Sequence, residues 1–435
     1  MTCEDTGAIE PLNLASDVDL FEGMTRIEGG GVSSARGFRA AGVHAGFRAD
    51  PERLDLALIV ADEPAACAAT FTQNVFCAAP VSVSREYLDG VSYGTARALV
   101  VNSGTANAAT GTLGLENARE TARIVSEAVG CPANEVMVAS TGVIGVHLNL
   151  DTFETGVPLA YEALSNDGGA AAARAIMTTD THPKEVAVEF SGDDIGYPGC
   201  RFTIGGMAKG AGMIMPNMAT MIACLTTDAP LAPDVLHHAL VCVVGDTFNK
   251  VTIDSDTSTN DCCYLFASGA AAKGASLFEL GSPAYEAFEH ALLAVCNTIA
   301  RAMAADGEGA TRLVTVNVAG ALDDAQADAA ARTVANSPLV KTAIFGHDAN
   351  WGRIAGALGR SGAQFDQYGV SIDIMGLPVL RQGLPVPFDE EEALRRFERP
   401  EIEIDVELGA GTASTTMWTC DFSHDYVTIN GDYRT

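Results

Sequence analysis

The sequence predicts a mixed α/β or α+β fold in which helices cover β-sheets. Apolar segments of strand-like composition alternate with segments whose apolar residues recur at helical spacing. The strand-like segments include continuous apolar runs and alternating ones, which indicates sheets buried to different degrees. With 435 residues, 48% of them hydrophobic, the chain is long enough for a large core and two or three domains.

The best-bounded element in the first half is a helix over 115–129, because its apolar periodicity stops at Gly130, a residue typical of helix ends. Residues 1–22, rich in Asp and Glu, are expected to form a poorly ordered acidic leader. The other elements predicted here are strands at 54–60, 66–72, 98–102, 135–140 and 185–190, and helices near 158–164 and 170–177.

The alternation resumes after the glycine-rich stretch that ends near residue 228. Helices are predicted at 233–244 and 282–304, and strands at 313–318, 342–345, 370–375 and 402–408. A long helix meets a new strand near 307–309, so residues 307–435 are expected to form a C-terminal subdomain.

Composition excludes several classes of function. The formal net charge of -30 repels phosphate backbones and anionic lipids, so neither nucleic acid nor a membrane is an expected partner. No apolar run reaches the ~20 residues that span a bilayer, and the N-terminus lacks a signal pattern, so a cytosolic location is expected. The 11 cysteines contain no C-x-x-C pair and the eight histidines no H-x-x-x-H pair, so no metal site is expected.

The most unusual stretch is 205–221, where four glycines fall within eight residues around Lys209. It has neither the spacing of a P-loop nor that of a dinucleotide-binding loop. We expect a loop that is flexible around Lys209 and presents the Ala219–Thr220 peptide bond to attack by the Thr220 hydroxyl. Cleavage would leave Thr220 as a new N-terminus, whose α-amine can serve as the base for its own hydroxyl. The alternative is that Thr220 is an ordinary strand residue after a glycine-rich turn, and the spacing taken by itself favours this alternative.

Eight segments in order are similar to the ornithine acetyltransferases, the bifunctional glutamate N-acetyltransferases of arginine biosynthesis. The resemblance runs from about Gly30 to Thr435. The segments are LVVNSGTANAATG (99–111), VMVASTGVIG (136–145), AIMTTDTHPKEV (175–186), GMAKGAGMIMPNMATMIACLTTDA (206–229), FNKVTIDSDTSTND (248–261), DGEGATRLV (306–314), GHDANWGRIAGALGRSG (346–362) and INGDYRT (429–435). The resemblance implies the αββα sandwich of the self-cleaving ornithine acetyltransferase and aminopeptidase type, with a smaller C-terminal α/β domain.

The resemblance also implies an activity: ping-pong transfer of acetyl from N-acetylornithine to glutamate through an acetyl-threonine. It implies self-cleavage into an α chain, 23–219 after the leader, and a β chain, 220–435, assembled as an α2β2 heterotetramer. No cofactor is implied, and acetyl-CoA is a second donor for some members. Two rivals stay open: a self-processing aminopeptidase, in which water resolves the acyl-enzyme, and a binding protein that never matures.

The resemblance also implies which residues form the site, because each lies in one of the segments similar to the family. Thr220 resembles the nucleophile, and Thr141 and Gly142 resemble the pair that stabilises the oxyanion. Lys209 resembles the residue that contacts the substrate carboxylate, and Glu308 the acidic residue that holds an ammonium group. The remaining substrate-binding residues that the resemblance implies are Thr178 or Thr179, Asn430 and Thr435.

Each of these residues has a structural alternative. Thr141 and Gly142 could form a turn after a strand, and Lys209 could be a solvated loop charge.

Asp254, Asp256 and Asp261 fit an Asx-rich turn between strands better than a cation-binding loop, because EF-hand spacing is absent.

Overall fold

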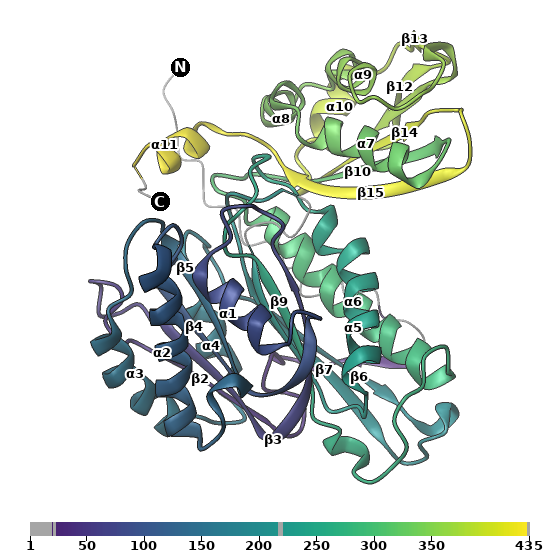
Figure 1. Ribbon diagram of the computed structural model, residues 1–435. Helices are drawn as coiled ribbons and strands as arrows, with labels where there is room; N and C mark the ends of the chain where they lie inside the picture. Colours follow the sequence, from purple (N-terminus) through teal and green to yellow (C-terminus); the bar gives the residue numbers. More distant parts are fainter. Residues whose placement is uncertain (1–19, 21–22, 216–220, 433–435) are drawn as a thin grey trace.

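The structure is a computed structural model that describes residues 20, 23–215 and 221–432 (Figure 1). Within these residues the strands form a nine-stranded and a six-stranded sheet. The large sheet has the order β1-β6-β7-β8-β9-β3-β4-β5, with β2 paired to β3. Its strands are β1 (Met24–Arg26), β2 (Phe38–Val43), β3 (Leu56–Phe71), β4 (Tyr93–Thr105), β5 (Val136–Val143), β6 (Lys184–Ser191), β7 (Arg201–Lys209), β8 (Ile222–Thr227) and β9 (Cys262–Ala267).

The long strand β3 joins two halves of the large sheet. Its first half pairs with β2 and its second half with β9, and its register against β4 shifts between Val60 and Ala65. The outward side chains of the first half (Leu56, Leu58) pack among helices α1 (Ala79–Tyr87), α2 (Gly111–Val129) and α3 (Leu150–Glu162). In the second half, Ala68 packs instead beneath α5 (Pro233–Asp246) and α6 (Pro283–Ala305). Helix α4 (Gly169–Ala175) packs against β2 and β3.

The two halves fold face to face, as alternate side chains show. In β4, Leu99 and Val101 enter the core between the halves, while Ala98 and Val100 face α2. In β9, Tyr264 enters the same inner core, and its neighbours Cys263 and Leu265 lie in the core beneath α5 and α6. Helices therefore cover both outer faces of two stacked sheet layers, and the expected αββα sandwich is confirmed (Figure 1).

A second unit with its own core follows α6. Its sheet has the order β13-β12-β11-β14-β10-β15. The strands are β10 (Leu313–Ala321), β11 (Ser371–Ile374), β12 (Leu377–Arg381), β13 (Leu384–Pro385), β14 (Glu401–Glu407) and β15 (Ala413–Cys420), and the helices α7 (Asp324–Ala335), α8 (Pro338–Phe345), α9 (Trp351–Gly359) and α10 (Glu390–Arg396). Strand β15 leads into α11 (His424–Asp432), which Figure 1 shows reaching back over the larger unit.

Most predicted elements are present, and α2 ends as expected, with Gly130 in the left-handed conformation at φ 77°. Two predictions are wrong. The strands expected at 54–60 and 66–72 are one strand, because β3 carries Asp62, Glu63 and Pro64 in an exposed irregularity. The strand expected at 342–345 is the last turn of α8, whose start is set by Pro338 and by the Ser337 side chain that accepts from Val340 N. A segment of four residues is too short to show the helical period.

Candidate active site

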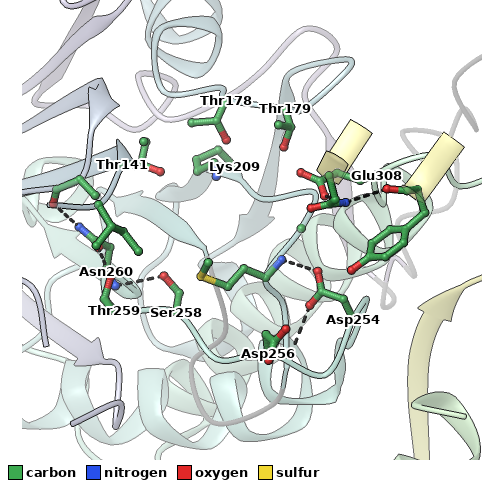
Figure 2. A pocket seen from close by; sticks show the side chains of 17 residues that line it. Thr141, Thr178, Thr179, Lys209, Asp254, Asp256, Ser258, Thr259, Asn260 and Glu308 are labelled. Atoms are coloured by element: carbon green, nitrogen blue, oxygen red, sulfur yellow. Dashed lines mark hydrogen bonds between the residues drawn. The ribbon is translucent and has the colours of Figure 1, made fainter. Parts of the chain in front are cut away.

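One pocket, of about 150 Å³, lies between the ends of the sheet layers and α11 (Figure 2). It is smaller than the roughly 300–1,000 Å³ typical of sites for drug-sized ligands, so it suits a molecule of amino-acid size. The predicted site residues that line it are Thr141, Gly142, Thr178, Thr179, Lys209, Glu308 and Asn430. The other three, Ala219, Thr220 and Thr435, lie outside the described residues.

The expected oxyanion pair lies at the end of β5, beside β4. Gly142 has φ 129°, and a Cβ there would lie 2.3 Å from the carbonyl carbon of Gly104 in β4. Only glycine fits this position, so the ends of β4 and β5 can lie close together. Asn260 holds the strand end by donating to Ala106 O at 2.6 Å and Ser140 O at 2.8 Å. The Thr141 side chain and the Gly142 backbone are therefore on a rigid edge of the pocket.

Lys209 does not lie in a flexible loop, contrary to the expectation from its glycine neighbours. It is the last residue of β7, only 3% exposed, and its side chain points into the pocket (Figure 2). The glycines serve close packing: a Cβ at Gly205 would lie 2.1 Å from Gly31 O, and one at Gly206 2.6 Å from Leu225 Cδ2. Burial lowers the pKa of Lys209 from its usual range.

A buried ion cluster beside the pocket holds three of its segments together. Lys184 Nζ donates to Asp180 Oδ1 at 2.7 Å and to Asp306 Oδ2 at 2.6 Å. Asp180 also accepts from Gly210 N at 2.7 Å, next to Lys209, and from Thr178 N at 2.9 Å. Burial alone would lower the pKa of Lys184, but the two carboxylates outweigh it and raise the pKa. For Asp180, the opposing effect of burial is outweighed by the lysines, and the pKa is lowered.

Glu308 and Asn430 form the side of the pocket that α11 covers. Asn430 Nδ2 donates to Glu308 Oε2 at 2.8 Å, and Glu308 N donates to Ala211 O at 2.7 Å. The Tyr426 ring, which also lines the pocket, stacks on Phe422 with centroids 4.6 Å apart. The C-terminal segment containing Asn430 is thus a wall of the pocket.

The segment 254–260 supplies pocket residues that the sequence did not single out as functional. Asp254 accepts from Met213 N at 2.6 Å and Ile214 N at 2.9 Å, which agrees with the Asx-rich turn expected there. The signal that could have identified this segment is its density of hydroxyl and carboxylate groups between two apolar runs. The residues from it that line the pocket are Asp254, Asp256, Ser258, Thr259 and Asn260.

Asp261 follows this segment, at the start of β9. It is 1% exposed and accepts from Met221 N at 3.0 Å, which places its carboxyl group next to the residue after Thr220. Burial raises its pKa well above the usual range, which favours the protonated carboxyl group that can donate a proton.

The matching family model and three relatives similar to this chain carry the same name. The model of the ArgJ family matches residues 39–435. "Arginine biosynthesis bifunctional protein ArgJ" of Synechococcus sp. is 46% identical over 415 residues, which cover 93% of this chain and 98% of the relative. The protein of the same name from Nitratidesulfovibrio vulgaris is 46% identical over 406 residues, covering 92% and 99%. A rice relative whose name adds "chloroplastic" is 42% identical over 435 residues, covering 98% and 92%.

Two solved structures are also similar. The ArgJ protein of Bacillus halodurans is 41% identical over 48% of this chain and 97% of its own, with a TM-score of 0.46. Ornithine acetyltransferase of Mycobacterium tuberculosis, solved in complex with ornithine, is 40% identical over 46% of this chain and 100% of its own, with a TM-score of 0.41. The match over 39–435 and the identity to full-length relatives establish that this chain belongs to the ArgJ family.

Proposed function

We propose that the protein transfers an acetyl group from N-acetylornithine to glutamate, giving ornithine and N-acetylglutamate through an acetyl-threonine at Thr220. Membership of the ArgJ family supports this activity. The observation that carries it is the convergence of Thr141, Gly142, Lys209 and Glu308 on one small pocket, although they lie up to 167 positions apart (308 − 141 = 167).

In the first half-reaction, the Lys209 ammonium binds the α-carboxylate of N-acetylornithine and Glu308 binds the free side-chain ammonium. The Thr220 hydroxyl attacks the acetyl carbonyl while the α-amine of the same residue takes up its proton. The Thr141 hydroxyl and the Gly142 N–H donate to the oxyanion. Collapse of the intermediate returns the proton to the leaving nitrogen, and ornithine departs.

In the second half-reaction, the amine of glutamate attacks the ester carbonyl of acetyl-Thr220. The α-amine of Thr220 takes up the proton that the attacking amine loses, while the same two donors stabilise the oxyanion. When the intermediate collapses, this proton passes to the leaving threonine oxygen and restores the free hydroxyl. These steps use only groups of the chain and its substrates, so we assign no cofactor. Acetyl-CoA is the proposed second donor, and a rate assay that supplies each donor separately with glutamate tests this.

The free α-amine of Thr220 requires cleavage of the bond to Ala219, which we propose the chain performs on itself. The products would be an α chain ending at Ala219 and a β chain starting at Thr220, assembled as α2β2. Light scattering of the purified protein tests the assembly. Within the described residues, every helix is too short or too polar to span a lipid bilayer. The cytosolic location is tested by cell fractionation.

The variant Thr220→Ala separates this proposal from its rivals. We expect the wild type to give two bands on denaturing electrophoresis and to form N-acetylglutamate, and Thr220→Ala to give one full-length band and no product. Thr220→Ser is the matched variant, because it keeps a hydroxyl beside the α-amine and should still cleave. Full activity of an uncleaved protein would refute the mechanism, and acyl-enzyme hydrolysis without acetylglutamate would favour the aminopeptidase.

A further inference from the structure

Helices α5 and α6 lie side by side on the outer face of the sandwich (Figure 1). His238 and Cys242 are four residues apart on α5, so their side chains leave the same face of the helix. Glu289 comes from the neighbouring turn of α6. One potential ligand atom of each residue lies within 4.8 Å of the others. None of the three lines the active-site pocket.

We propose that His238, Cys242 and Glu289 form a binding site for Zn²⁺ that bridges α5 and α6. Imidazole nitrogen, thiolate sulfur and carboxylate oxygen are the ligands that Zn²⁺ takes in proteins. The H-x-x-x-C spacing is not the H-x-x-x-H pattern sought in the sequence, and the third ligand lies 47 positions further along the chain (289 − 242 = 47). The site is therefore visible only in the fold.

The spacing of the ligand atoms fits a tetrahedral ion. Zinc bound to nitrogen at ~2.0 Å and to sulfur at ~2.3 Å holds these two atoms roughly 3.6 Å apart. His238 Nδ1 and Cys242 Sγ are 3.9 Å apart, so a small side-chain rotation closes the difference. Three protein ligands leave the fourth position open to water, because His238 and Cys242 are both exposed.

Tyr285 supports the same three residues from α6. Its hydroxyl donates to Glu289 Oε1 at 2.8 Å and lies 2.8 Å from His238 Nδ1. The hydrogen bond to Glu289 is the kind of outer contact that orients a metal-ligating carboxylate. Zinc binds His238 as the neutral imidazole with its proton on Nε2, so that the Nδ1 lone pair faces the ion.

The electrostatic surroundings favour a cation. The Glu289 carboxylate is one of the three ligands, and Asp246 lies one helical turn beyond Cys242 on α5. Both are acidic residues, on a chain whose net charge is -30. Zinc would replace the thiol proton and neutralise this patch. Because α5 packs on β3 and β9 and α6 on β6 and β7, the ion would link helices that cover different strands.

Titration of the purified, metal-free protein with Co²⁺ tests the site, because cobalt takes zinc positions and absorbs in the near ultraviolet when bound to a thiolate. We expect one equivalent to produce this band and Zn²⁺ to remove it by competition. Cys242→Ser should lose the band and bind zinc at least tenfold more weakly, and His238→Asn should weaken zinc binding similarly. Zinc should raise the melting temperature of the wild type but not that of Cys242→Ser.

Two matched controls make the result decisive. His237→Asn changes the neighbouring histidine of α5, and Cys3→Ser removes a thiol that lies outside the described residues; both should bind cobalt like the wild type. Among the cysteines of the described residues, Cys242 alone is exposed, whereas the others are buried or partly buried. The proposal is overturned if Cys242→Ser keeps the band, if Cys3→Ser loses it, or if the wild type shows none.

Discussion

Replacing Lys184 with methionine removes the only cation seen bridging two buried carboxylates in the described part of the chain. The side chains of Lys184 and Asp180 are 0% exposed and that of Asp306 is 3% exposed. Methionine fills a similar volume, so the main effect is the loss of charge. Breaking a buried ion pair costs about 3–5 kcal/mol, because the partner charge stays buried and uncompensated. Stabilities of domains are about 5–15 kcal/mol, so this is a large fraction.

The loss of stability caused by Lys184→Met should depend on pH. Without Lys184, burial at Asp180 is offset only by Lys209 and by backbone hydrogen bonds, so the pKa of Asp180 should rise above its wild-type value. An acid with a raised pKa in the folded state stabilises less as pH rises, so the difference from the wild type should shrink in acid. Activity should fall through a higher KM, because Asp180 also binds Gly210 N and Thr178 N at the pocket.

The measurement is urea unfolding at several pH values, followed by circular dichroism, with KM and kcat measured alongside. Arg201→Met is the control: its side chain is 50% exposed in an ion pair with Glu189, and its loss should cost less than about 1 kcal/mol. Adding Asp306→Asn to Lys184→Met should recover part of the stability. A Lys184→Met protein within about 1 kcal/mol of the wild type at neutral pH would refute this reasoning.

Three further predictions concern single residues. Burial raises the pKa of Asp228 to about 6, so its contribution to the free energy of unfolding should fall by about 3 kcal/mol between about pH 3 and about pH 7. Asp228→Asn should flatten that part of the urea-unfolding profile, and an unchanged profile would contradict the prediction. Asp261→Asn keeps the acceptor for Met221 N but cannot donate an acidic proton, so the cleaved fraction on timed gels should rise at least tenfold more slowly. Asn430→Ala should raise KM about tenfold through the lost hydrogen bond to Glu308, whereas Thr428→Ala on the same helix should not.

The local sequence was sufficient to predict a structural feature wherever the residues that determine it lie within one helix or strand. The end of α2 follows from Gly130, because a left-handed residue terminates a helix whatever surrounds it. Strands β4, β5 and β6 could be recognised from apolar runs, and β3 was recognised as two separate strands. Strands β1, β2, β7 and β9 were not predicted. The family motifs named Lys209 and Glu308, and the structure places both in one pocket.

Contacts between distant residues needed the tertiary structure. In the sequence, Lys184 resembles an ordinary lysine of a strand. Its partner Asp306 is 122 positions away, so only the fold shows that the two are buried together. Lys209 was expected in a mobile loop, because glycine signals freedom in a sequence but permits close packing inside a sheet. The sequence motifs identified the functional groups of the site. Only the tertiary structure showed which groups are buried together or paired, because burial and charge pairing depend on residues that are distant in the chain.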